Sequence, residues 1–508
     1  MSKGKLLAVC LVWLFIFAAL AATWKFFVQP WRQQAAEDRQ RTTIDSTSST
    51  SQYRATVHLS LDSFSGYAVL RSAKFREELS QKKIKVELVD DQADYVERIE
   101  ALAKGDVQMA AFPVDALINV LAERDDQPAT IVAVLDESRG ADAMVGYREV
   151  FPDVDSLNRP ETRIVATLDS PSETLARVMM DRFSFDRLSG NPFVGAKDAP
   201  DVVKLYRDSR PDAHDVYVLW EPYVSQMLSE NDKLHKILGS EEFRGKIVDC
   251  LVVSRDYLVK HEAEVQDVVA CYFRAAYDYR DSMESLVISD GKSLGTPLSA
   301  ERAKALVDGI WWKNTQENFA HLGLRPAGSI QLLEDMITDI TQVLLRTKAI
   351  GRDPTGGKPT ILFYDKLLAH LQSSDFHPGI SSETLRDDQV KLPDLSEQQW
   401  NELVPVGTLS INRLVFPRGR SDLTESSQAT LDQLAKDLQN WPRYYLIVQG
   451  NAALAGDSQA NQTLAGARAK AAEEYLVEAG VAPNRVRAVA GKPSGSTSVT
   501  FKLGELPY

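Results

Sequence analysis

Short apolar segments that alternate with amphipathic ones constrain the fold of this chain more than any other feature of its sequence. The first such segment, ATVHLSL at residues 55–61, alternates apolar and polar side chains and is followed by a stretch with helical spacing. Short strands that alternate with helices predict a mostly parallel sheet with helices on both faces. Further strands are predicted at residues 84–89, 107–112, 131–135, 143–147, 163–168, 202–206, 216–220 and 247–253.

Length and local composition divide the chain into several parts. With 508 residues it is too long for one hydrophobic core. A run of small hydroxyl residues before residue 52 and a stretch rich in Pro, Asp and Ser after residue 375 are typical of linkers. The predicted parts are an N-terminal tail and anchor at 1–32, a flexible linker at 33–54, an α/β domain at 55–375, a second linker at 376–405 and a last domain at 406–508.

The N-terminal region has the character of a membrane anchor. Residues 6–22 carry no charge, and aromatic side chains follow at 24, 26 and 27. Extended to Val28, this run forms a helix of about 23 residues, enough to cross ~30 Å of hydrocarbon. Ala19-Leu20-Ala21 has the small-x-small form of a signal-peptide cleavage site. A cleaved signal peptide is therefore the alternative to an uncleaved anchor.

The overall charge limits the partners of this chain. A formal net charge of -13 argues against nucleic acid, although a small anion can still bind at helix N-termini. Cys250 and Cys271 sit in apolar patterns that suit buried free thiols, with one disulfide as the alternative. The sequence has no recognisable metal-binding spacing, nucleophile elbow or phosphate loop. We therefore expect neither an enzyme nor a cofactor or metal site.

Three turns rich in Ser and Asp follow predicted strands, at residues 62–66 (DSFSG), 136–140 (DESRG) and 169–172 (DSPS). Ligands of open α/β sheets bind beyond the carboxyl ends of the strands, where hydroxyls and free N–H groups suit anions or polar ring edges. Ser and Asp in such turns also serve as helix N-caps, and Arg139 could be an ordinary exposed turn residue. The candidate ligand-binding residues are Ser63, Phe64, Ser65, Glu137, Ser138, Arg139, Ser170 and Ser172.

Residues 55–375 resemble a family of periplasmic binding proteins. The segments SFSGY, GDVQMAAF, AVLDESRGADAMV, ATLDSPSETL and DVYVLWEPYVSQML stand in the order of the SsuA-like substrate-binding proteins of the nitrate, sulfonate and pyrimidine-precursor class. The resemblance implies a two-lobed type II fold with a second lobe at about 141–246 and hinge crossovers near 138–142 and 246–250. It also implies that Trp220 forms a flat wall of the cleft and that Glu221 accepts a hydrogen bond from the ligand. The alternatives are that Trp220 only packs in the core and that Glu221 is only a solvated surface residue.

Residues 406–508 resemble the OmpA-like peptidoglycan-binding domain. Gly450, Gly456, Asn461, Leu464, Arg468 and Ala469 fall in register with the family's loop-and-helix motif. Arg468 matches the carboxylate-binding arginine, but Ala453 stands where the family has the aspartate that recognises diaminopimelate. Asn451, Asn461 and Arg468 are therefore candidate peptidoglycan contacts, and an assembly or protein-contact role is the alternative.

These features predict an α/β chain with an N-terminal transmembrane helix, a two-lobed binding domain and a small OmpA-like domain. Proteins with this pairing are often labelled phosphate-transporter substrate-binding/OmpA fusions, although no residue here singles out phosphate. We expect a single-pass protein of the bacterial inner membrane with its bulk in the periplasm. It would bind a small polar or anionic solute for ABC-type transport or sensing, and contact peptidoglycan or membrane proteins. A ligand-free envelope scaffold is the alternative.

Overall fold

The computed structural model describes residues 52–328, 330–374, 376, 391–454, 456–491 and 498–506. The predicted membrane segment, most of the first linker and much of the second lie outside these residues. Within the described part, no helix combines the length and the apolar character that crossing a membrane requires. Residues 57–82 and 86–508 belong to one compact unit, and the contacts below lie within it.

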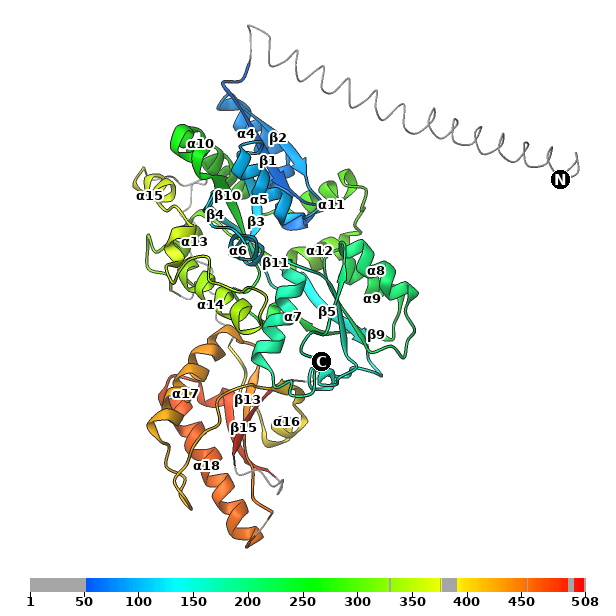
Figure 1. Ribbon diagram of the computed structural model, residues 1–508, viewed down its shortest axis with the longest axis vertical. Coiled ribbons are helices and arrows are strands. Elements are labelled where there is room, and N and C mark those ends of the chain that lie inside the picture. The colour runs from blue at the N-terminus through cyan, green and yellow to red at the C-terminus, as the bar shows by residue number, and fades with distance from the viewer. Residues whose placement is uncertain are drawn as a thin grey trace, which may run out of the picture. The chain divides into compact units, whose positions relative to one another are not determined.

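A six-stranded sheet forms the first lobe (Figure 1). Its strand order is β11-β4-β10-β3-β1-β2. The inner strand β4, next to the edge strand β11, is buried at all ten positions, which explains its continuous apolar sequence. The strands are β1 (Ala55–Leu61), β2 (Ile84–Asp90), β3 (Met109–Pro113), β4 (Ala129–Ser138), β10 (Val248–Ser254) and β11 (Ile310–Trp312).

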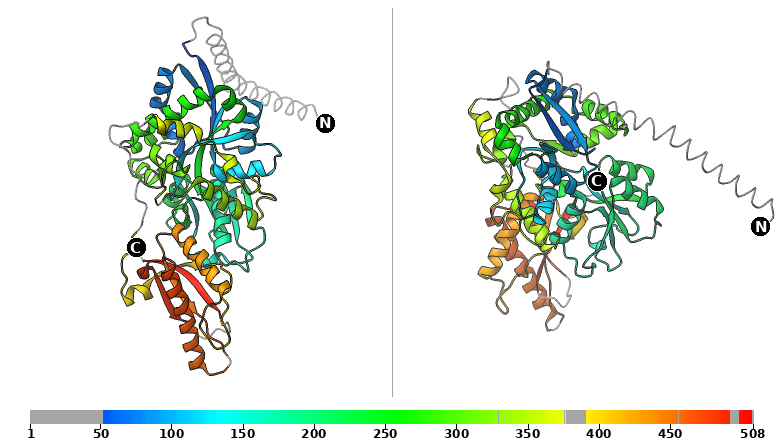
Figure 2. Two further views of the ribbon diagram at one scale, coloured as in Figure 1. Left: turned by 90° about the vertical axis from the view of Figure 1, so that its left-hand side faces the viewer. Right: turned by 45° about the horizontal axis from the view of Figure 1, so that its top comes forward.

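Helices pack against both faces of this sheet, as the views of Figure 2 also show. One face of β10, with Cys250 and Val252, joins the apolar cluster that includes α5, α6 and α14. Cys250 and Cys271 are buried free thiols. The helices of this lobe are α3 (Ala68–Arg71), α4 (Ala73–Gln81), α5 (Tyr95–Lys104), α6 (Val114–Ala122), α10 (Arg255–Tyr279), α11 (Met283–Ser293), α12 (Ala300–Asp308), α13 (Thr315–His321), α14 (Leu333–Arg346) and α15 (Lys366–Ser373).

A second, five-stranded sheet with the order β7-β6-β8-β5-β9 forms the second lobe. The chain passes into it between β4 and β5 and returns between β9 and β10, so two crossovers join the lobes. Its elements are β5 (Asp142–Tyr147), β6 (Arg163–Thr167), α7 (Pro171–Arg182), β7 (Phe193–Ala196), α8 (Ala199–Asp208), β8 (Asp215–Trp220), α9 (Tyr223–Glu230) and β9 (Leu234–Gly239).

Both sheets are mixed, whereas the sequence predicted mostly parallel strands. Strand β10 runs antiparallel to both β3 and β4, and β5 runs antiparallel to both β8 and β9. These are the first strands after each crossover, and a chain that enters a sheet from a neighbouring lobe is not bound by the βαβ geometry that makes strands parallel.

The predicted strand at residues 202–206 is wrong, because this segment lies inside helix α8. Asp198 caps the helix by accepting a hydrogen bond from the backbone N–H of Asp201 at 2.9 Å, and Pro200 follows at the start of the first turn. The apolar side chains at 202, 203 and 206 then share one buried face. The cap therefore overrides the β-branched residues of the segment.

The C-terminal domain is a four-stranded sheet of order β12-β15-β13-β14 with helices packed on it. Gly450 lets α18 lie against β13, because an added Cβ there would sit 1.9 Å from the carbonyl oxygen of Ala465. Its elements are α16 (Glu397–Glu402), β12 (Val404–Thr408), α17 (Glu425–Asp437), β13 (Tyr445–Gly450), α18 (Ser458–Glu478), β14 (Val486–Ala490) and β15 (Val499–Glu505).

Backbone hydrogen bonds and an ion pair connect this domain to the second lobe. The N–H of Ser184 donates to the carbonyl of Thr408 at 2.9 Å, next to an isolated bridge between Phe183 and Leu409. Arg182 lies 2.9 Å from Asp437 of α17. One apolar cluster contains side chains from both parts. We call this contact the β12 seam.

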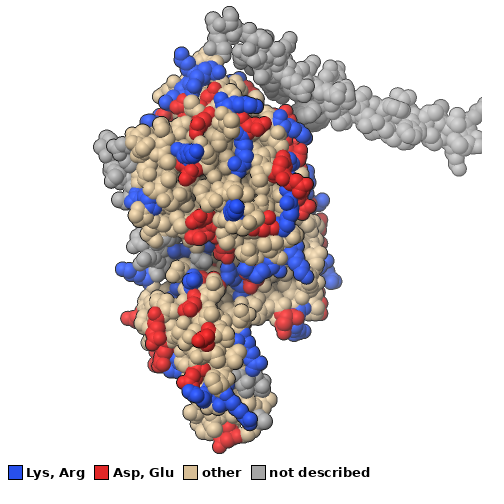
Figure 3. Space-filling view, turned by 60° about the vertical axis from the view of Figure 1, so that its left-hand side comes forward, with Lys and Arg blue, Asp and Glu red and all other residues tan. Residues whose placement is uncertain are grey.

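Charges of both signs are interspersed on the surface. On the face drawn in Figure 3, Lys and Arg side chains alternate with Asp and Glu, and no large area carries one sign.

Candidate functional site

A small cavity lies between the two lobes. It holds about 20 Å³, room for about one water molecule. Both lobes and the second crossover contribute to its wall, and we call it the interlobe cavity. The lining residues are Asp62, Phe64, Tyr67, Tyr95, Pro113 and Asp249 of the first lobe, Asp142, Pro171 and Trp220 of the second, and Ile247 between them.

The turn after β1 places the first residues of the cavity. Asp62 accepts a hydrogen bond from the N–H of Phe64 at 2.9 Å, and Arg71 donates to the carbonyls of both residues at 2.7 and 2.8 Å. Gly66 brings the turn close to the sheet, because an added Cβ would lie 2.4 Å from the Phe64 ring and 2.6 Å from Oδ2 of Asp136. Local hydrogen bonds thus hold Asp62 and Phe64 in place.

Asp62 is balanced by a buried arginine. Arg98 is 1% exposed and donates from Nη2 to Asp62 at 3.0 Å. It also donates from Nε to Asp91 at 2.6 Å and from Nη1 to the carbonyl of Ala111 at 2.6 Å. One guanidinium therefore serves two carboxylates.

Asp249 and Asp142 face the cavity from opposite lobes, and each is 2% exposed. Oδ1 of Asp249 accepts from the Tyr67 hydroxyl, and Oδ2 of Asp142 accepts from Ser138 at 2.6 Å. In the described part of the chain, no hydrogen bond reaches the second oxygen of either carboxyl. Burial raises the pKa of Asp142 to about 7 and raises that of Asp249 well above its usual range, where Asp136 adds to the effect.

A further carboxyl lies beside Asp249 on the neighbouring strand. Asp136 on β4 is the register partner of Asp249 on β10 and is fully buried. Neither of its oxygens has a hydrogen-bond partner among the residues that the structure describes. Burial raises the pKa of Asp136 well above its usual range; the charge of Lys313 opposes this, and nearby carboxylates reinforce it. Two neighbouring carboxyls, of which Asp249 lines the cavity, thus have few donors.

Aromatic rings form the rest of the wall. Phe64 and Tyr67 meet edge to face with their centroids 5.3 Å apart, and Tyr95 packs on Phe112 at 5.5 Å. Trp220, at the end of β8, contributes the apolar side from the second lobe. The cavity thus combines carboxyl groups with ring faces.

Two helices begin beside the cavity, and their first turns already carry acids. Asp115 lies in the first turn of α6 and Glu173 in that of α7. Thr174 of α7 donates to Asp115 at 2.6 Å, which connects the two lobes directly. Burial raises the pKa of Asp115 to about 6. These helix N-termini are therefore less available to an external anion than the sequence suggested.

Two of the ten predicted ligand-binding residues, Phe64 and Trp220, line the interlobe cavity. Ser138 positions Asp142, and Glu221 accepts hydrogen bonds from Ser225 at the start of α9. The remaining predicted serines lie in the first and third turns. Ser63 is exposed, Ser65 is buried in its turn, Ser170 donates to the carbonyl of Thr167, and the Ser172 hydroxyl is buried without a described partner.

The sequence did not lead us to Asp142, Asp249, Tyr67 or Tyr95. A usable signal was present, since IVDCLVV places an acid in the middle of an apolar strand and buried acids need a reason. What the pattern could not supply is that strands from two sheets bring these acids together. The three turns also do not converge on one edge, because the second turn leads to another cavity.

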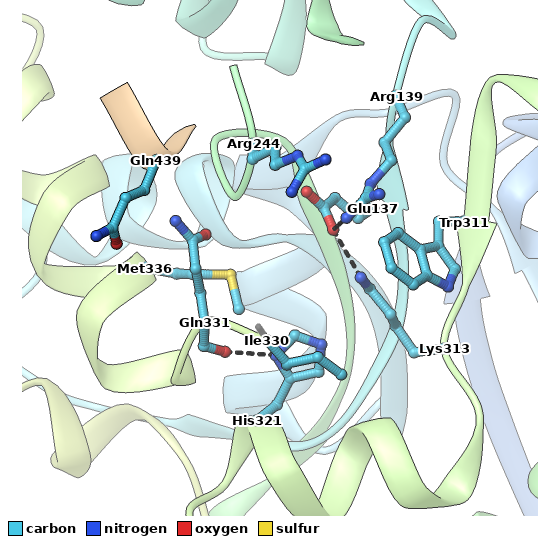
Figure 4. Close-up of a pocket in the computed structure, with 10 residues that line it drawn as sticks. All are labelled: Glu137, Arg139, Arg244, Trp311, Lys313, His321, Ile330, Gln331, Met336 and Gln439. Carbon is cyan, nitrogen blue, oxygen red and sulfur yellow. Dashed lines mark hydrogen bonds and ion pairs between the residues drawn. The ribbon is translucent and has the colours of Figure 1, made fainter. Parts of the chain in front are cut away.

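That second cavity lies beside the crossovers and is drawn in Figure 4. It holds about 90 Å³. Glu137 and Arg139, predicted for the ligand cleft, lie here instead. We call it the hinge cavity. Its lining residues are Glu137, Arg139, Arg244, Trp311, Lys313, His321, Ile330, Gln331, Met336 and Gln439.

A buried carboxylate organises the hinge cavity. Glu137 accepts from Lys313 at 2.6 Å, from Arg139 at 3.0 Å and from the N–H of Gly245 at 2.9 Å. The Arg139 guanidinium also lies 3.4 Å from the centre of the Trp311 ring. Burial opposes ionisation, but Lys313 and Arg139 hold the pKa of Glu137 well below its usual range. Through Lys313 and Gly245, Glu137 connects the first crossover to the end of β11 and to the second crossover.

The predicted peptidoglycan contacts have structural partners in the C-terminal domain. Asn451 is buried; it accepts a hydrogen bond from Gln449 at 3.0 Å and donates one to Thr500 at 3.3 Å. Asn461 donates to the carbonyl of Ala453 at 3.3 Å. Arg468 donates from Nε to the carbonyl of Arg420 at 3.0 Å and lies over the Phe416 ring. Arg468 thus holds the loop before α17.

Comparison with known proteins identifies an OmpA-family domain at residues 415–498. This confirms the resemblance of the C-terminal part. The peptidoglycan-associated lipoprotein of Rhizobium meliloti is 35% identical over 78 residues, which cover 15% of this chain and 44% of that protein. The protein of the same name from Brucella melitensis is 32% identical over 78 residues, 15% of this chain and 46% of that protein. The chain spans less than half the length of these curated relatives.

Solved structures of periplasmic and ABC-type binding proteins align with the chain at low identity. The aliphatic sulphonate-binding protein SsuA from Escherichia coli is 14% identical with a TM-score of 0.45, covering 62% of this chain and 99% of its own. The ligand-binding component of an ABC-type import system from Staphylococcus aureus, with zinc bound, is 12% identical with a TM-score of 0.47, covering 62% and 98%. SsuA from Xanthomonas axonopodis pv. citri, bound to MOPS, is 13% identical with a TM-score of 0.45, covering 59% and 96%.

Proposed function

We propose that this chain is a membrane-tethered receptor that captures a small solute between its two lobes, outside the cytoplasm. The observation that carries the proposal is the interlobe cavity, which both lobes build and in which Asp142 and Asp249 each present an oxygen without a described donor. A solute that filled these positions would bind both lobes at once. Binding, rather than catalysis, is the role that we assign.

The cavity as described admits little more than a water molecule, so solute entry requires the lobes to separate. Two crossovers provide the hinge, and the Thr174–Asp115 hydrogen bond provides a contact that separation would break. Glu137, Arg139 and Lys313 brace the crossovers. Ligand-driven closure of this kind supports either delivery to a transporter or signalling to a membrane partner.

The membrane tether is proposed from the uncharged N-terminal run, and the periplasmic position from the resemblance of both domains to periplasmic families. Cell fractionation tests them directly. The full chain should sediment with inner membrane and resist extraction by high salt, and added protease should degrade it in spheroplasts but not in intact cells. Recovery in the soluble periplasmic fraction would indicate a cleaved signal peptide instead.

For the C-terminal domain we propose contact with peptidoglycan or with an envelope protein. The OmpA-family match and the name of its relatives support this proposal. Ala453 replaces the expected aspartate and Arg468 is already engaged with main-chain carbonyls. Co-sedimentation of the purified chain with isolated sacculi tests the wall-binding role. Absence of co-sedimentation would leave the protein-contact role.

A ligand-free scaffold is the second candidate, and the small volume of the interlobe cavity favours it. A thermal-shift screen of the full chain in detergent against cations, anions, amino acids and heterocycles separates the two functions. A ligand at 100 times its Kd adds about 2.7 kcal/mol to the free energy of unfolding, which a melting curve resolves. If no compound raises the melting temperature, the receptor function is wrong.

A further inference from the structure

We infer that the solute of the interlobe cavity is an organic cation, in which an amine, ammonium or guanidinium group is joined to an apolar part. This inference rests on the proposed receptor function and names the ligand class of the same site. It replaces the anionic solute that the hydroxyl-rich turns suggested.

The charges around the cavity supply the first argument. The described lining contains three carboxyl groups, those of Asp62, Asp142 and Asp249, and no Lys, Arg or His side chain. Among the cations nearby, Arg98 is shared by Asp62 and Asp91, and Lys313 is bonded to Glu137. Each of these cations already has at least one carboxylate partner, so an entering anion would meet uncompensated carboxyl groups.

Hydrogen bonding supplies a second and independent argument. Asp142 and Asp249 are 2% exposed, they line the cavity, and one oxygen of each receives no hydrogen bond from the described residues. An acceptor that faces such a cavity takes its hydrogen bond from water or from a ligand. An N–H group held between the two carboxyls would fill both positions and connect the lobes.

The aromatic wall indicates an organic cation and not a bare metal ion. Phe64, Tyr67, Tyr95 and Trp220 surround the acids, and ring faces attract ammonium and guanidinium groups while covering an apolar substituent. In the part of the chain that the structure describes, no three His, Cys, Asp or Glu side chains are arranged to hold a metal ion. A cation of mixed character matches both kinds of wall.

Protons are the competing occupants of the unfilled oxygens. Burial raises the pKa of Asp142 to about 7, and it raises the pKa values of Asp249 and of its neighbour Asp136 above the usual range. The groups that face Asp142 are Ser138, Asp115 and Glu221, of which the two acids reinforce the shift. An entering cation would displace protons, so its affinity should rise with pH up to and beyond about 7.

The test is a binding screen on the full chain in detergent, with matched probes that differ in charge. Benzylamine, benzyl alcohol and benzoate form one set, and phenylguanidine, phenylurea and phenylacetate form another. Melting temperature and titration calorimetry, each at pH 6 and pH 8, provide the readouts. We expect only the cation of a set to raise the melting temperature, and to bind more tightly at pH 8.

Two variants tie the effect to the cavity. Asp142→Asn and Asp249→Asn keep the shape of the protonated side chains and should weaken cation binding at least about tenfold. Asp232→Asn, at an exposed position of the second lobe, is the matched control and should bind like the unchanged chain. Near-ultraviolet circular dichroism verifies that each variant is folded, so a loss of binding reports on the site.

The possible outcomes distinguish the two proposals. A shift produced by the neutral or anionic members, or by Zn²⁺ or Mg²⁺ alone, would overturn the cation inference and leave the receptor function standing. Equal cation binding by the Asp142→Asn and Asp249→Asn variants would also overturn it. If neither these probes nor the wider compound screen produces a shift, both proposals fail and the scaffold function is left.

Discussion

The buried ion pair between Glu137 and Lys313 connects the two crossovers to the edge strand β11. Lys313 is 3% exposed, and its ammonium lies 2.6 Å from the carboxylate. Replacing Lys313 would leave the buried Glu137 with Arg139 as its remaining described cation, which costs more than losing an exposed pair.

We therefore expect Lys313→Met to lower the free energy of unfolding by about 3–5 kcal/mol. Lys304→Met removes an exposed lysine that pairs with Asp308, and should leave the free energy of unfolding nearly unchanged. Urea denaturation of both variants provides the comparison. A double variant, Glu137→Gln with Lys313→Met, should recover part of the loss, and failure to do so would show that Lys313 acts through packing.

Asp142 predicts a specific dependence of stability on pH. Its folded pKa of about 7 exceeds the unfolded value of about 3.9, so the folded state holds a proton that the unfolded state releases. This group stabilises the fold fully below about pH 4, and its contribution is lost as pH rises through about 7. The difference in melting temperature between the unchanged chain and Asp142→Asn should therefore change across this window, measured in steps of one pH unit. A constant difference would mean that the carboxyl is ionised throughout.

At the scale of elements, the position of α18 depends on a residue without a side chain. A Cβ on Gly450 would overlap the carbonyl of Ala465, whereas a Cβ on Gly466 would meet its nearest neighbour at 3.5 Å. Gly450→Ala should lower the free energy of unfolding of the C-terminal domain by about 1–3 kcal/mol. Gly466→Ala should be neutral or stabilise by up to about 1 kcal/mol, because it lies inside a helix. Fluorescence of Trp441 during denaturation can follow this domain, and equal effects of the two variants would contradict the packing argument.

The positions of strands and helices were more predictable from the sequence than the strand directions or the contacts between distant elements. Strands with continuous burial, such as β4 and β10, are visible as apolar runs. The three-residue strand β11 and the partly exposed β7 carry too short or too mixed a pattern to be recognised. The segment 202–206 was misassigned because its cap lies four residues earlier. Asp142 and Asp249 belong to different sheets, and no local pattern can show that they face one cavity.

At the scale of the whole molecule, the contact between α6 and α7 relates the two lobes. The Thr174–Asp115 hydrogen bond is buried, and a lobe movement would have to break it. Thr174→Val keeps the side-chain volume and removes the donor, which should cost about 1–3 kcal/mol in the closed arrangement. Hydrogen exchange at the first turns of α6 and α7 should become faster in this variant. Thr338→Val, at an exposed position of α14, should leave exchange unchanged; no acceleration in Thr174→Val would show that the bond does not hold the lobes.

The β12 seam gives the C-terminal domain a fixed relation to the second lobe through main-chain bonds at residues 184 and 408. If this domain binds peptidoglycan or another protein, that contact would therefore restrict the position of the lobe that carries Asp142 and Trp220.

Asp136 stands beside Asp249 with two oxygens that no described donor reaches, and burial raises the pKa of both carboxyls. A bound amine must therefore displace protons that acid returns. Acidification of the surrounding compartment would then empty the receptor at constant solute concentration, so that its occupancy reports the ratio of solute to hydrogen ions and not the solute alone.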